Sequence, residues 1–422
     1  MVMAAAYPIT ITVLVDLGSS TTFPVSGTPF TLDSATYGKL DTGFLGSGTS
    51  NIVDVSSSVL KIQIGGGYNL TQDQFEPNQG YVRVYDPNGW WNPQNTASPY
   101  YGFLSPNKKV VIQATYSGTT YTQFSGYINS YKYSFPTDMS FGYVDLMVCD
   151  AFRLFNMASI TTVAGTSSGQ TTGQRINSIL DALNFPTALR KIDTGDYLVQ
   201  ADPGTSRLAL AALKNVEFVE QGAFYIDADG YAVFKSRTNT IKTGGAAPIT
   251  YFSNDGSAIT YAGVTFAHDD KLVVNQCNVT NIGGTLQSYS DAASIAQFFP
   301  HTVSQVNLVG YNNAAALDVA RIYVQTRKDT TIRIDSLTQD LTTPNYASGI
   351  LAALTLDYFS TVNIKNVQSN GSTITKTLQI MGSNYTITPN SYDISFTTSE
   401  SIVDGFVLNS VTEGILDTSI LN

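Results

Sequence analysis

The feature that most constrains this chain is a long succession of short apolar stretches in residues 7–150. Successive side chains of a strand point to opposite faces of its sheet, so alternating apolar and polar residues predict a half-buried strand. Gly, Pro, Ser and Asn separate these stretches, and no helical periodicity interrupts them. The region is therefore predicted to form a β-sandwich or β-barrel. Its expected strands include residues 59–64, 81–85, 110–116, 120–133 and 143–148.

The pattern changes after Asp150, where two amphipathic helices are predicted. Apolar residues at i, i+3, i+4 and i+7 predict a first helix that begins near Thr172 and ends before Pro186. The second helix has Ser206 as its expected N-cap and Gly222 in the position of a C-terminal glycine. These elements indicate a small α/β unit.

A hairpin and a further β region follow. Residues 227–230 end in an Asp-Gly pair, which is a strong turn signal between the apolar stretches 223–226 and 231–234. Residues 238–248 are rich in Thr, Gly and Ala and are expected to be a connector. The β pattern then resumes and contains one predicted helix, residues 312–327. The order of the chain is thus β, α/β, β.

Length and composition narrow the class of protein. The 422 residues exceed the ~250–300 at which a single core usually divides, so several domains are expected. Lys and Arg number 22 against 32 Asp and Glu, and the net charge of −10 disfavours tight binding to nucleic acid. Charged residues are only 13% of the chain, so uncharged polar side chains must cover much of the surface. No apolar run approaches the ~18 residues of a membrane helix, so no stable membrane insertion is expected.

Few residues are suited to catalysis or to metal binding. His268 and His301 are the only histidines, and neither has a partner at the spacing of a metal site or a catalytic triad. Cys149 and Cys277 lie far apart without CxxC spacing and are predicted to be buried thiols. We therefore expect a non-enzymatic protein with no catalytic residue, no cofactor and no metal.

Two short motifs favour structural interpretations. Residues 227–230 resemble the opening of a calcium loop, but Lys235 and Ser236 stand where later ligands belong, so a hairpin turn is favoured. The glycine run 65–67 lacks the Lys-Ser/Thr pair of a phosphate loop and opens no helix, so a turn or bulge is favoured. The paired carboxylates of a glycosidase could converge in many folds, but no local pattern singles out such a pair.

One loop is unusually aromatic. It contains the only tryptophans, Trp90 and Trp91, and also Tyr100 and Tyr101. Exposed aromatic side chains bind sugars or partner proteins because their flat faces offer a large apolar contact area. Aromatic packing over a turn is the alternative. These four residues are the candidate partner-contact site.

Several distinctive segments are spread over most of the chain, from about residue 59 to residue 418. The first group is YVRVYD at residues 81–86, WNPQNTASPYY at residues 91–101 and QFSGYI at residues 123–128. Further segments follow in order at residues 174–183, 190–195, 222–227, 382–389 and 414–418. In this order they resemble the tail hub proteins of tailed bacteriophages, often called minor tail proteins. That family frequently has Gly or Arg in place of Trp90-Trp91, and the Gly/Ser-rich residues 43–58 have no clear counterpart in it.

The resemblance implies a mainly β fold with α+β parts, in which two tail-tube-like β-barrels flank a small α/β domain. The implied domains are residues 1–150 for the first barrel, 151–240 for the α/β domain, 241–400 for the second barrel with a helical insertion near 312–327, and 401–422 for a C-terminal tail. It also implies a homotrimer, because three subunits with two barrels each present six barrels to a six-fold tail tube.

The resemblance further implies a structural protein of the virion, made in the host cytoplasm and located at the distal end of the tail. Its implied partners are the tail tube or a distal tail protein, the tape-measure protein, and fibre or spike proteins. DNA would pass through its lumen during ejection. The net negative charge suggests that acidic side chains line this lumen, where they would repel DNA from the wall.

Two other classes of function stay open from the sequence. One is a tail-associated hydrolase of cell-wall glycan or peptide. The other is a carbohydrate-binding adhesin, in which Trp90, Trp91 and the abundant tyrosines would form the binding surface.

Overall fold

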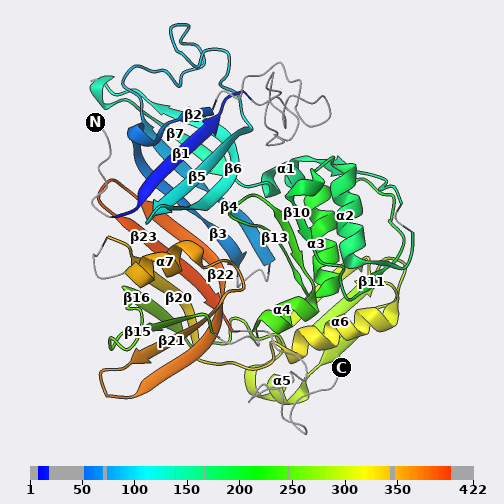
Figure 1. Ribbon diagram of the computed structural model, residues 1–422. Helices are drawn as coiled ribbons and strands as arrows, with labels where there is room; N and C mark the ends of the chain where they lie inside the picture. Colours follow the sequence, from blue (N-terminus) through cyan, green and yellow to red (C-terminus); the bar gives the residue numbers. More distant parts are fainter. Residues whose placement is uncertain are drawn as a thin grey trace, which may run out of the picture.

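A computed structural model describes residues 8–18, 52–69, 74–137, 139–165, 167–244, 248–342 and 347–400. Residues 43–51 of the Gly/Ser-rich stretch, the tail 401–422 and the motif at 414–418 lie outside these ranges. The described chain combines a large β region with a helical region beside it (Figure 1). The prediction of a mainly β protein with a smaller α/β part is confirmed.

One sheet takes strands from both ends of the chain. Among the described residues, its pairing path runs from β16 to β2 without closing into a ring, and β21 (Thr361–Val367) with β15 (Thr250–Ser253) branches from β22. The strands in order of pairing are β16 (Gly263–Ala267), β20 (Arg333–Asp340), β23 (Tyr392–Ser399), β22 (Thr373–Ile387), β3 (Val59–Asn69), β4 (Gln74–Tyr85), β7 (Tyr143–Cys149), β6 (Thr119–Ser134), β5 (Lys108–Tyr116), β1 (Thr10–Asp16) and β2 (Ile52–Asp54). The five strands expected between residues 59 and 148 are all present.

The two halves of this sheet meet where β3 pairs with β22. The antiparallel register runs from Gly67 opposite Gly382 to Ile62 opposite Ile387. Gly67 has a φ of +114°, and a Cβ at this position would lie 2.3 Å from the Cα of Gly382. The register of β3 against β4 shifts between Gly65 and Gly67, so the glycine run is a bulge, as predicted.

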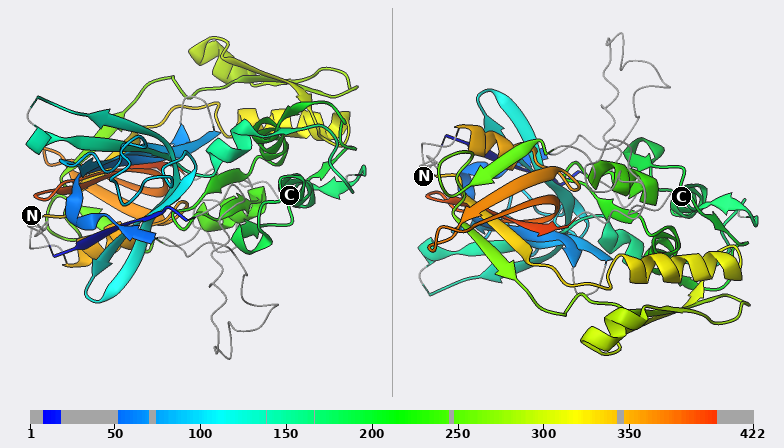
Figure 2. Two further views of the ribbon diagram at one scale, coloured as in Figure 1. Left: turned by 90° about the horizontal axis from the view of Figure 1, so that it is seen from above. Right: turned by 90° about the horizontal axis from the view of Figure 1, so that it is seen from below.

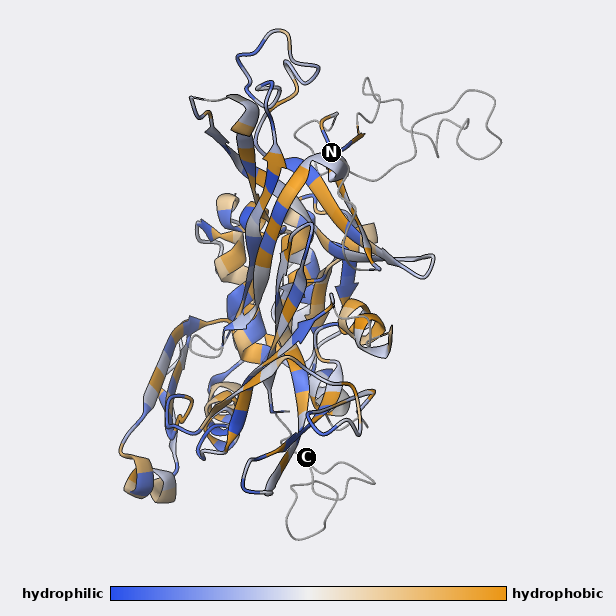
Figure 3. Ribbon diagram, turned by 90° about the vertical axis from the view of Figure 1, so that its left-hand side faces the viewer, coloured by the Kyte–Doolittle hydropathy of each residue, from blue (hydrophilic) through white to orange (hydrophobic). Residues whose placement is uncertain are grey.

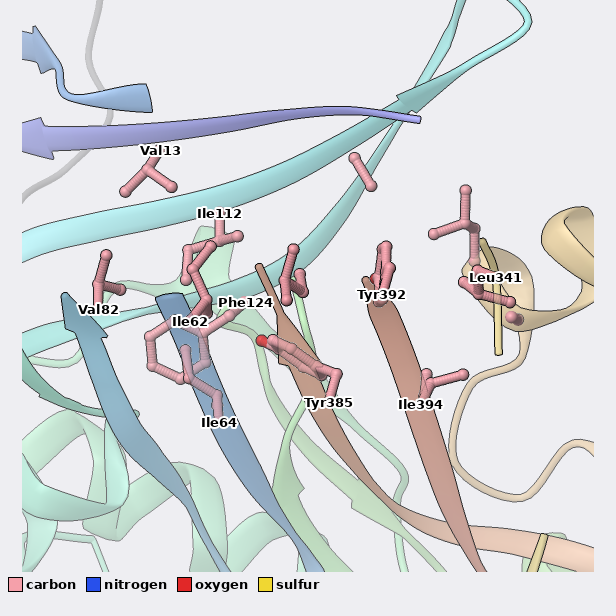
Figure 4. Packing of buried hydrophobic residues seen from close by; sticks show 14 of the residues in the cluster. Val13, Ile62, Ile64, Val82, Ile112, Phe124, Leu341, Tyr385, Tyr392 and Ile394 are labelled. Carbon is pink, nitrogen blue, oxygen red and sulfur yellow. The ribbon is translucent and has the colours of Figure 1, made fainter. Parts of the chain in front are cut away.

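A shared hydrophobic core lies beneath both halves. Val13 and Ile62, from the first β region, belong to one buried cluster with Tyr385 and Tyr392 from the second (Figure 4). The hydroxyl groups of both tyrosines donate hydrogen bonds to Gln123, at 3.2 Å to its backbone oxygen and 3.1 Å to its Oε1. Orange and blue residues alternate along the strands in Figure 3, which is the periodicity that the sequence predicts.

The α/β unit packs three helices against short strands. Its elements are α1 (Phe152–Met157), β8 (Ser159–Ile160), β9 (Gln170–Thr171), α2 (Thr172–Ala182), β10 (Arg190–Ile192), β11 (Leu198–Val199), β12 (Arg207–Leu208), α3 (Ala209–Glu220), β13 (Ala223–Ile226) and β14 (Ala232–Lys235). The predicted first helix is α2, which Thr171 and Gln174 begin with a capping box. The predicted hairpin is the β13–β14 pair, and Gly230 in its turn has a φ of +90°.

The second helix begins and ends at other residues than expected. Ser206 is not its N-cap, because Arg207 and Leu208 pair with β8 as a short strand and α3 starts only at Ala209. At the other end Gln221, rather than Gly222, takes the left-handed conformation. Gly222 is needed for space instead, since a Cβ there would lie 2.3 Å from the Lys235 carbonyl oxygen.

The segment after the hairpin is more helical than predicted. Residues 238–248 are not a simple connector, because α4 (Arg237–Gly244) occupies the first part of this segment. In the described part of residues 248–400, the second β region holds three helices where one was predicted: α5 (Ala292–Phe298), α6 (Asn313–Gln325) and α7 (Ala347–Thr355). The predicted helix at 312–327 is α6, with Asn312 as its N-cap. Helix α5 is too short and α7 too uniformly apolar to give an amphipathic signal.

A three-stranded sheet lies at one side of the molecule (Figure 2). It has the order β18 (Gln287–Ser290), β17 (Gln276–Asn281), β19 (Thr302–Leu308), and α6 packs against β17 and β18. Cys277 and Val279 of β17 share a core with the helices of the α/β unit, and this core also contains Phe75 and Met381 of the main sheet. Packing therefore groups this segment with the region 151–240, and the division into domains remains a prediction.

A buried polar network joins the main sheet to the α/β unit. Asp150 is 1% exposed, and its carboxylate accepts hydrogen bonds from the backbone N–H of Asn78 at 2.7 Å and of Phe152 at 3.0 Å. The side chain of Asn78 donates to the Ile226 oxygen at 3.4 Å and accepts from the Tyr358 hydroxyl at 2.8 Å. Because burial disfavours the charged carboxylate, the pKa of Asp150 is raised to about 7.

Candidate partner-contact surface

The loop between β4 and β5 is organised around one buried carboxylate. Asp86 is 3% exposed and follows directly after β4. Its two oxygens accept hydrogen bonds from the backbone N–H of Trp90 at 2.8 Å and of Trp91 at 3.1 Å. Its own N–H donates to the Gly142 oxygen at 2.8 Å, on the connection that leads into β7. These bonds hold the backbone of both tryptophans against the end of the main sheet.

Consecutive turns stiffen the rest of the loop. The N–H of Asn92 donates to Gly89, that of Asn95 to Asn92, that of Ser98 to Asn95 and that of Tyr101 to Ser98, over 3.0 to 3.2 Å. The Asn95 side chain also donates to the Gly89 oxygen at 3.0 Å, and the Ser98 hydroxyl donates to the Trp90 oxygen. Asn, Ser and Gly favour such turns because they accept unusual backbone angles or bond to the nearby backbone.

The four candidate residues divide into an exposed pair and a supporting pair. Trp90 is 43% exposed and Tyr101 is 49% exposed. Trp91 is only 3% exposed and packs its ring against Tyr100 at 5.0 Å and Tyr131 at 6.3 Å between centroids. Tyr100 is half-buried, touches Trp90 edge-on at 6.5 Å, and has its pKa raised by burial. Trp90 and Tyr101 can touch a partner, whereas Trp91 and Tyr100 support them.

Further exposed aromatic residues gather around this loop. Tyr133 and Phe135 stack at 5.9 Å with nearly parallel rings, and a Cβ on Gly89 would lie 3.7 Å from the Phe135 ring. The Tyr85 hydroxyl donates to the Ser140 oxygen at 2.9 Å, beside the 68% exposed Phe141. We call the following set the aromatic surface: Tyr85, Trp90, Tyr101, Phe103, Tyr133, Phe135 and Phe141.

Sequence reasoning missed most members of the aromatic surface. Tyr133 ends the expected strand 120–133 and Phe135 lies just beyond it, and an aromatic residue in or near a strand usually predicts burial. The available signal was their place beyond the apolar part of β6, next to Pro136 and Ser134, where the chain turns. The surface offers flat apolar faces and few ionisable groups, which suits binding rather than acid–base chemistry.

The other candidate residues have structural surroundings. His301 Nε2 lies 3.0 Å from the Phe298 oxygen and 3.5 Å from an oxygen of Asp270. Cys149 and Cys277 are buried, as predicted, and burial raises their pKa values to about 12 and about 11. Within the described ranges, no three His, Cys, Asp or Glu side chains are placed to hold a metal ion. No helix in the same ranges has the length and apolarity needed to cross a membrane.

The 227–230 turn borders a cavity of about 410 Å³ between the α/β unit and the main sheet. Asp227 accepts a hydrogen bond from the Tyr231 N–H at 2.8 Å. It also forms an ion pair with Lys191, at 2.7 Å. Burial raises the pKa values of Asp227 and of Asp357, which also lines the cavity. The carboxylate of Asp227 is thus used by the hairpin turn, which agrees with the structural interpretation of this motif.

Comparison with known proteins gives a clear result only at the level of structure. No protein-family model matches the chain, and no curated protein matches its sequence. A tail protein from Neisseria meningitidis superimposes with a TM-score of 0.56 at 10% identity, over 94% of this chain and 98% of that one. The 43 kDa tail protein of prophage MuSo2 from Shewanella oneidensis gives a TM-score of 0.50 at 11% identity, over 84% of this chain and 98% of that one.

The chain has the fold of phage tail proteins. The match extends over nearly the whole length of both chains, so the tail-protein fold includes the main sheet and the α/β unit together. The expected resemblance to this group is confirmed in fold. Sequence identity near 10% carries no information about individual residues, so the role of the aromatic surface rests on its geometry alone.

Proposed function

We propose that this protein is a structural component of a phage tail tip, in which three copies form a hub that closes the tail tube. The observation that carries the proposal is the whole-length match to the tail-protein fold. A non-enzymatic role accords with the described part of the chain, where the candidate site consists of packed and exposed aromatic residues. Turnover of purified cell wall by the protein would contradict this role and favour the hydrolase.

The continuous sheet supports the finer geometry of the proposal. Its first half, from β3 to β2, and its second half, from β16 to β22, each contribute buried residues to the shared core. In a three-fold ring, each half would serve as one tube-like barrel wall, so that three subunits present six similar walls to the tail tube. The edge strands β16 and β2 are the natural places for contact between subunits.

The oligomeric state of the purified protein tests the ring. We expect a trimer by native mass spectrometry, or trimerisation on addition of the tail-tube or distal tail protein that completes the ring. A protein that stays monomeric with these partners would contradict the three-fold hub. Acidic side chains on the inner wall, where DNA would pass, are a further part of the proposal; a reconstruction with a neutral or basic lumen would contradict this part.

Location in the particle tests the function most directly. Gold-labelled antibodies against the protein, viewed on intact virions by electron microscopy, should label the distal end of the tail. Label on the capsid, or along the length of the fibres, would contradict the tail-tip role. The same experiment on particles disrupted at the tip would show whether tape-measure and fibre or spike proteins remain attached to the labelled piece.

The aromatic surface is the proposed contact with neighbouring tail proteins. Trp90→Ala should reduce incorporation into tails at least about tenfold, because central aromatic contacts often contribute ~2 kcal/mol or more to binding. Ile249→Ala, at a 69% exposed position outside this surface, is the matched control and should assemble normally. If Trp90→Ala instead abolished binding to host glycans while assembly was unaffected, the carbohydrate-binding adhesin would replace this contact role.

A further inference from the structure

Phe299 is the most exposed large apolar side chain in the described part of the chain, at 80%. It follows directly after α5, which lies at the lower edge of the molecule in Figure 1. Its backbone has a φ of 66° and a ψ of 167°, a conformation that glycine adopts readily and that a bulky residue avoids. An exposed aromatic residue in this conformation must be held there by its neighbours.

A buried asparagine holds the backbone of Phe299. Asn275 is 0% exposed, and its Nδ2 donates a hydrogen bond to the Phe299 oxygen at 2.8 Å. Its Oδ1 accepts from the His301 N–H, also at 2.8 Å. The Phe299 N–H donates to the Ile295 oxygen at 3.0 Å, which closes the last turn of α5. The backbone around Phe299 is therefore fixed in advance, which lowers the entropy cost of binding a partner through its ring.

A groove of about 390 Å³ lies where the α/β unit, the three-stranded sheet and the main sheet meet. Phe218 and Tyr323 in its wall lie 5.5 Å apart between ring centroids, and the Arg327 guanidinium lies over the Tyr323 ring at 4.1 Å. Val306, which is 63% exposed, also lines the groove. The aromatic residues and the methionine of the lining are Tyr68, Phe75, Phe218, Tyr323, Phe359 and Met381. Such a lining favours contact with another aromatic ring.

The chemistry of the lining favours this groove over the cavity of about 410 Å³ as the place for a phenyl ring. The carboxyl groups of Asp150, Asp227 and Asp357 line that cavity, and a phenyl ring would remove them from water without offering a hydrogen bond. Phe299 does not line the groove of its own chain, and Asn275 fixes the position of its backbone. The occupant that fits the groove is therefore Phe299 of a second copy.

We propose that Phe299 of one copy inserts into the groove of a neighbouring copy, where its ring packs against Phe218, Tyr323 and Val306. This inference rests on the proposed three-fold hub and adds a contact between subunits to those of the edge strands β16 and β2. Phe299 and the groove are different parts of the surface, so the contact is heterologous. A heterologous contact that is repeated by rotation closes a ring.

Sedimentation velocity of the full-length chain, under the conditions in which it trimerises, tests this contact. Phe299→Gly removes the ring and also suits the left-handed backbone angle, so the variant should fold. Its association should be at least about tenfold weaker than that of wild type, as expected when a buried aromatic anchor is truncated. Val306→Asp places a charge in the groove and should weaken association to a similar extent.

Leu286→Asp is the matched control for Val306→Asp. Leu286 is also 63% exposed and lies just before β18 of the same small sheet, but it does not line the groove. This variant should associate as strongly as wild type. An equal loss in Leu286→Asp and Val306→Asp would overturn the proposal, because any charge on this sheet would then have the same effect.

A mixture of the two weakened variants gives the sharpest test. The Phe299→Gly chain keeps an intact groove, and the Val306→Asp chain keeps its Phe299. The mixture should associate at least about tenfold more tightly than either variant alone, because each unlike pair restores one contact. No recovery in the mixture, or a loss in only one of the two variants, would overturn the proposal, since Phe299 or the groove would then contact a tail protein of another kind.

The outcomes for Phe299→Gly and for wild type separate this contact from the proposed hub. A Phe299→Gly chain that trimerises as strongly as wild type would overturn the contact and leave the hub intact. A wild-type chain that stays monomeric with its tail partners would contradict the hub and the contact together.

Discussion

At the scale of single residues, neighbours in the sequence can have opposite roles. Trp90 and Trp91 are adjacent, and their N–H groups bind the two oxygens of the same carboxylate, Asp86. Trp91 nevertheless enters the core, whereas Trp90 stays 43% exposed on the aromatic surface. The direction of each side chain depends on the turn that Asp86 fixes.

This difference gives a first prediction. Trp91→Ala should lower the free energy of unfolding by about 3–5 kcal/mol, because it leaves a large cavity in the core. Trp90→Ala should lower it by only about 1 kcal/mol, since it loses little more than an edge contact with Tyr100. Urea denaturation of both variants measures the two values, and equal losses would show that Trp90 is also part of the core.

The buried carboxylate of Asp150 gives a second prediction, on pH dependence. Its pKa in the folded protein, about 7, lies above its ordinary value of 3.8, so the folded state binds a proton more strongly than the unfolded state. The resulting stabilisation is complete below pH 4 and is lost as the pH rises through 7. This group should therefore lower the free energy of unfolding by up to about 1.4 kcal/mol per pH unit between pH 4 and pH 7.

Asp150→Asn removes this titration and serves as the test. Its free energy of unfolding should be lower overall, because an amide cannot accept from both the Asn78 and Phe152 N–H groups. It should also depend less steeply on pH than that of wild type between pH 4 and pH 7. Parallel pH profiles for the two proteins would rule out Asp150 as a source of the dependence.

At the scale of elements, strand pairing depends on two facing glycines. Gly67 in β3 lies opposite Gly382 in β22, and this contact joins the two halves of the main sheet. Gly371, in the turn between β21 and β22, also has a positive φ, of +84°, but a Cβ there would meet nothing within 4 Å. Substitution of Gly371 therefore measures the energetic cost of the left-handed backbone angle alone. Substitution of Gly67 measures that cost together with the cost of steric crowding.

A third prediction follows from this comparison. Gly371→Ala should lower the free energy of unfolding by about 1 kcal/mol, which is the cost of a left-handed angle for a side chain with a Cβ. Gly67→Ala should lower it by about 3 kcal/mol or more, because the added methyl group also collides with the backbone of Gly382. Thermal and urea unfolding of both variants provide the test; similar losses would mean that β3 and β22 separate easily.

At the scale of the whole molecule, the units are tied together by shared cores. The main core combines residues from both β regions, and the second core combines the α/β unit with the three-stranded sheet. Phe75 of β4 belongs to the second core, and its ring lies 5.1 Å from that of Tyr225 of β13, so an aromatic contact joins the main sheet to the α/β unit. Neither β region buries its apolar face alone.

We therefore predict that the two β regions unfold in one cooperative step. Calorimetry should show one transition that includes both, with the α/β unit joining it through the Asn78–Asp150–Tyr358 network. Hydrogen exchange should give amides of β3 and β22 the same opening free energy. Separate melting of residues before and after the α/β unit would contradict a shared core and favour two independent barrels.

Local chemistry in the sequence determined the elements that depend on near neighbours. Alternating residues predicted the strands, Thr171 and Gln174 begin α2 as a helix pattern requires, and the Asp-Gly pair at 229–230 marked its hairpin. Only the tertiary structure decided that β3 pairs with β22, that Ser206 precedes a strand, and that Trp91 is buried beside an exposed Trp90. Those outcomes depend on contacts between distant segments, where packing of a shared core selects among pairings that local propensity leaves equal.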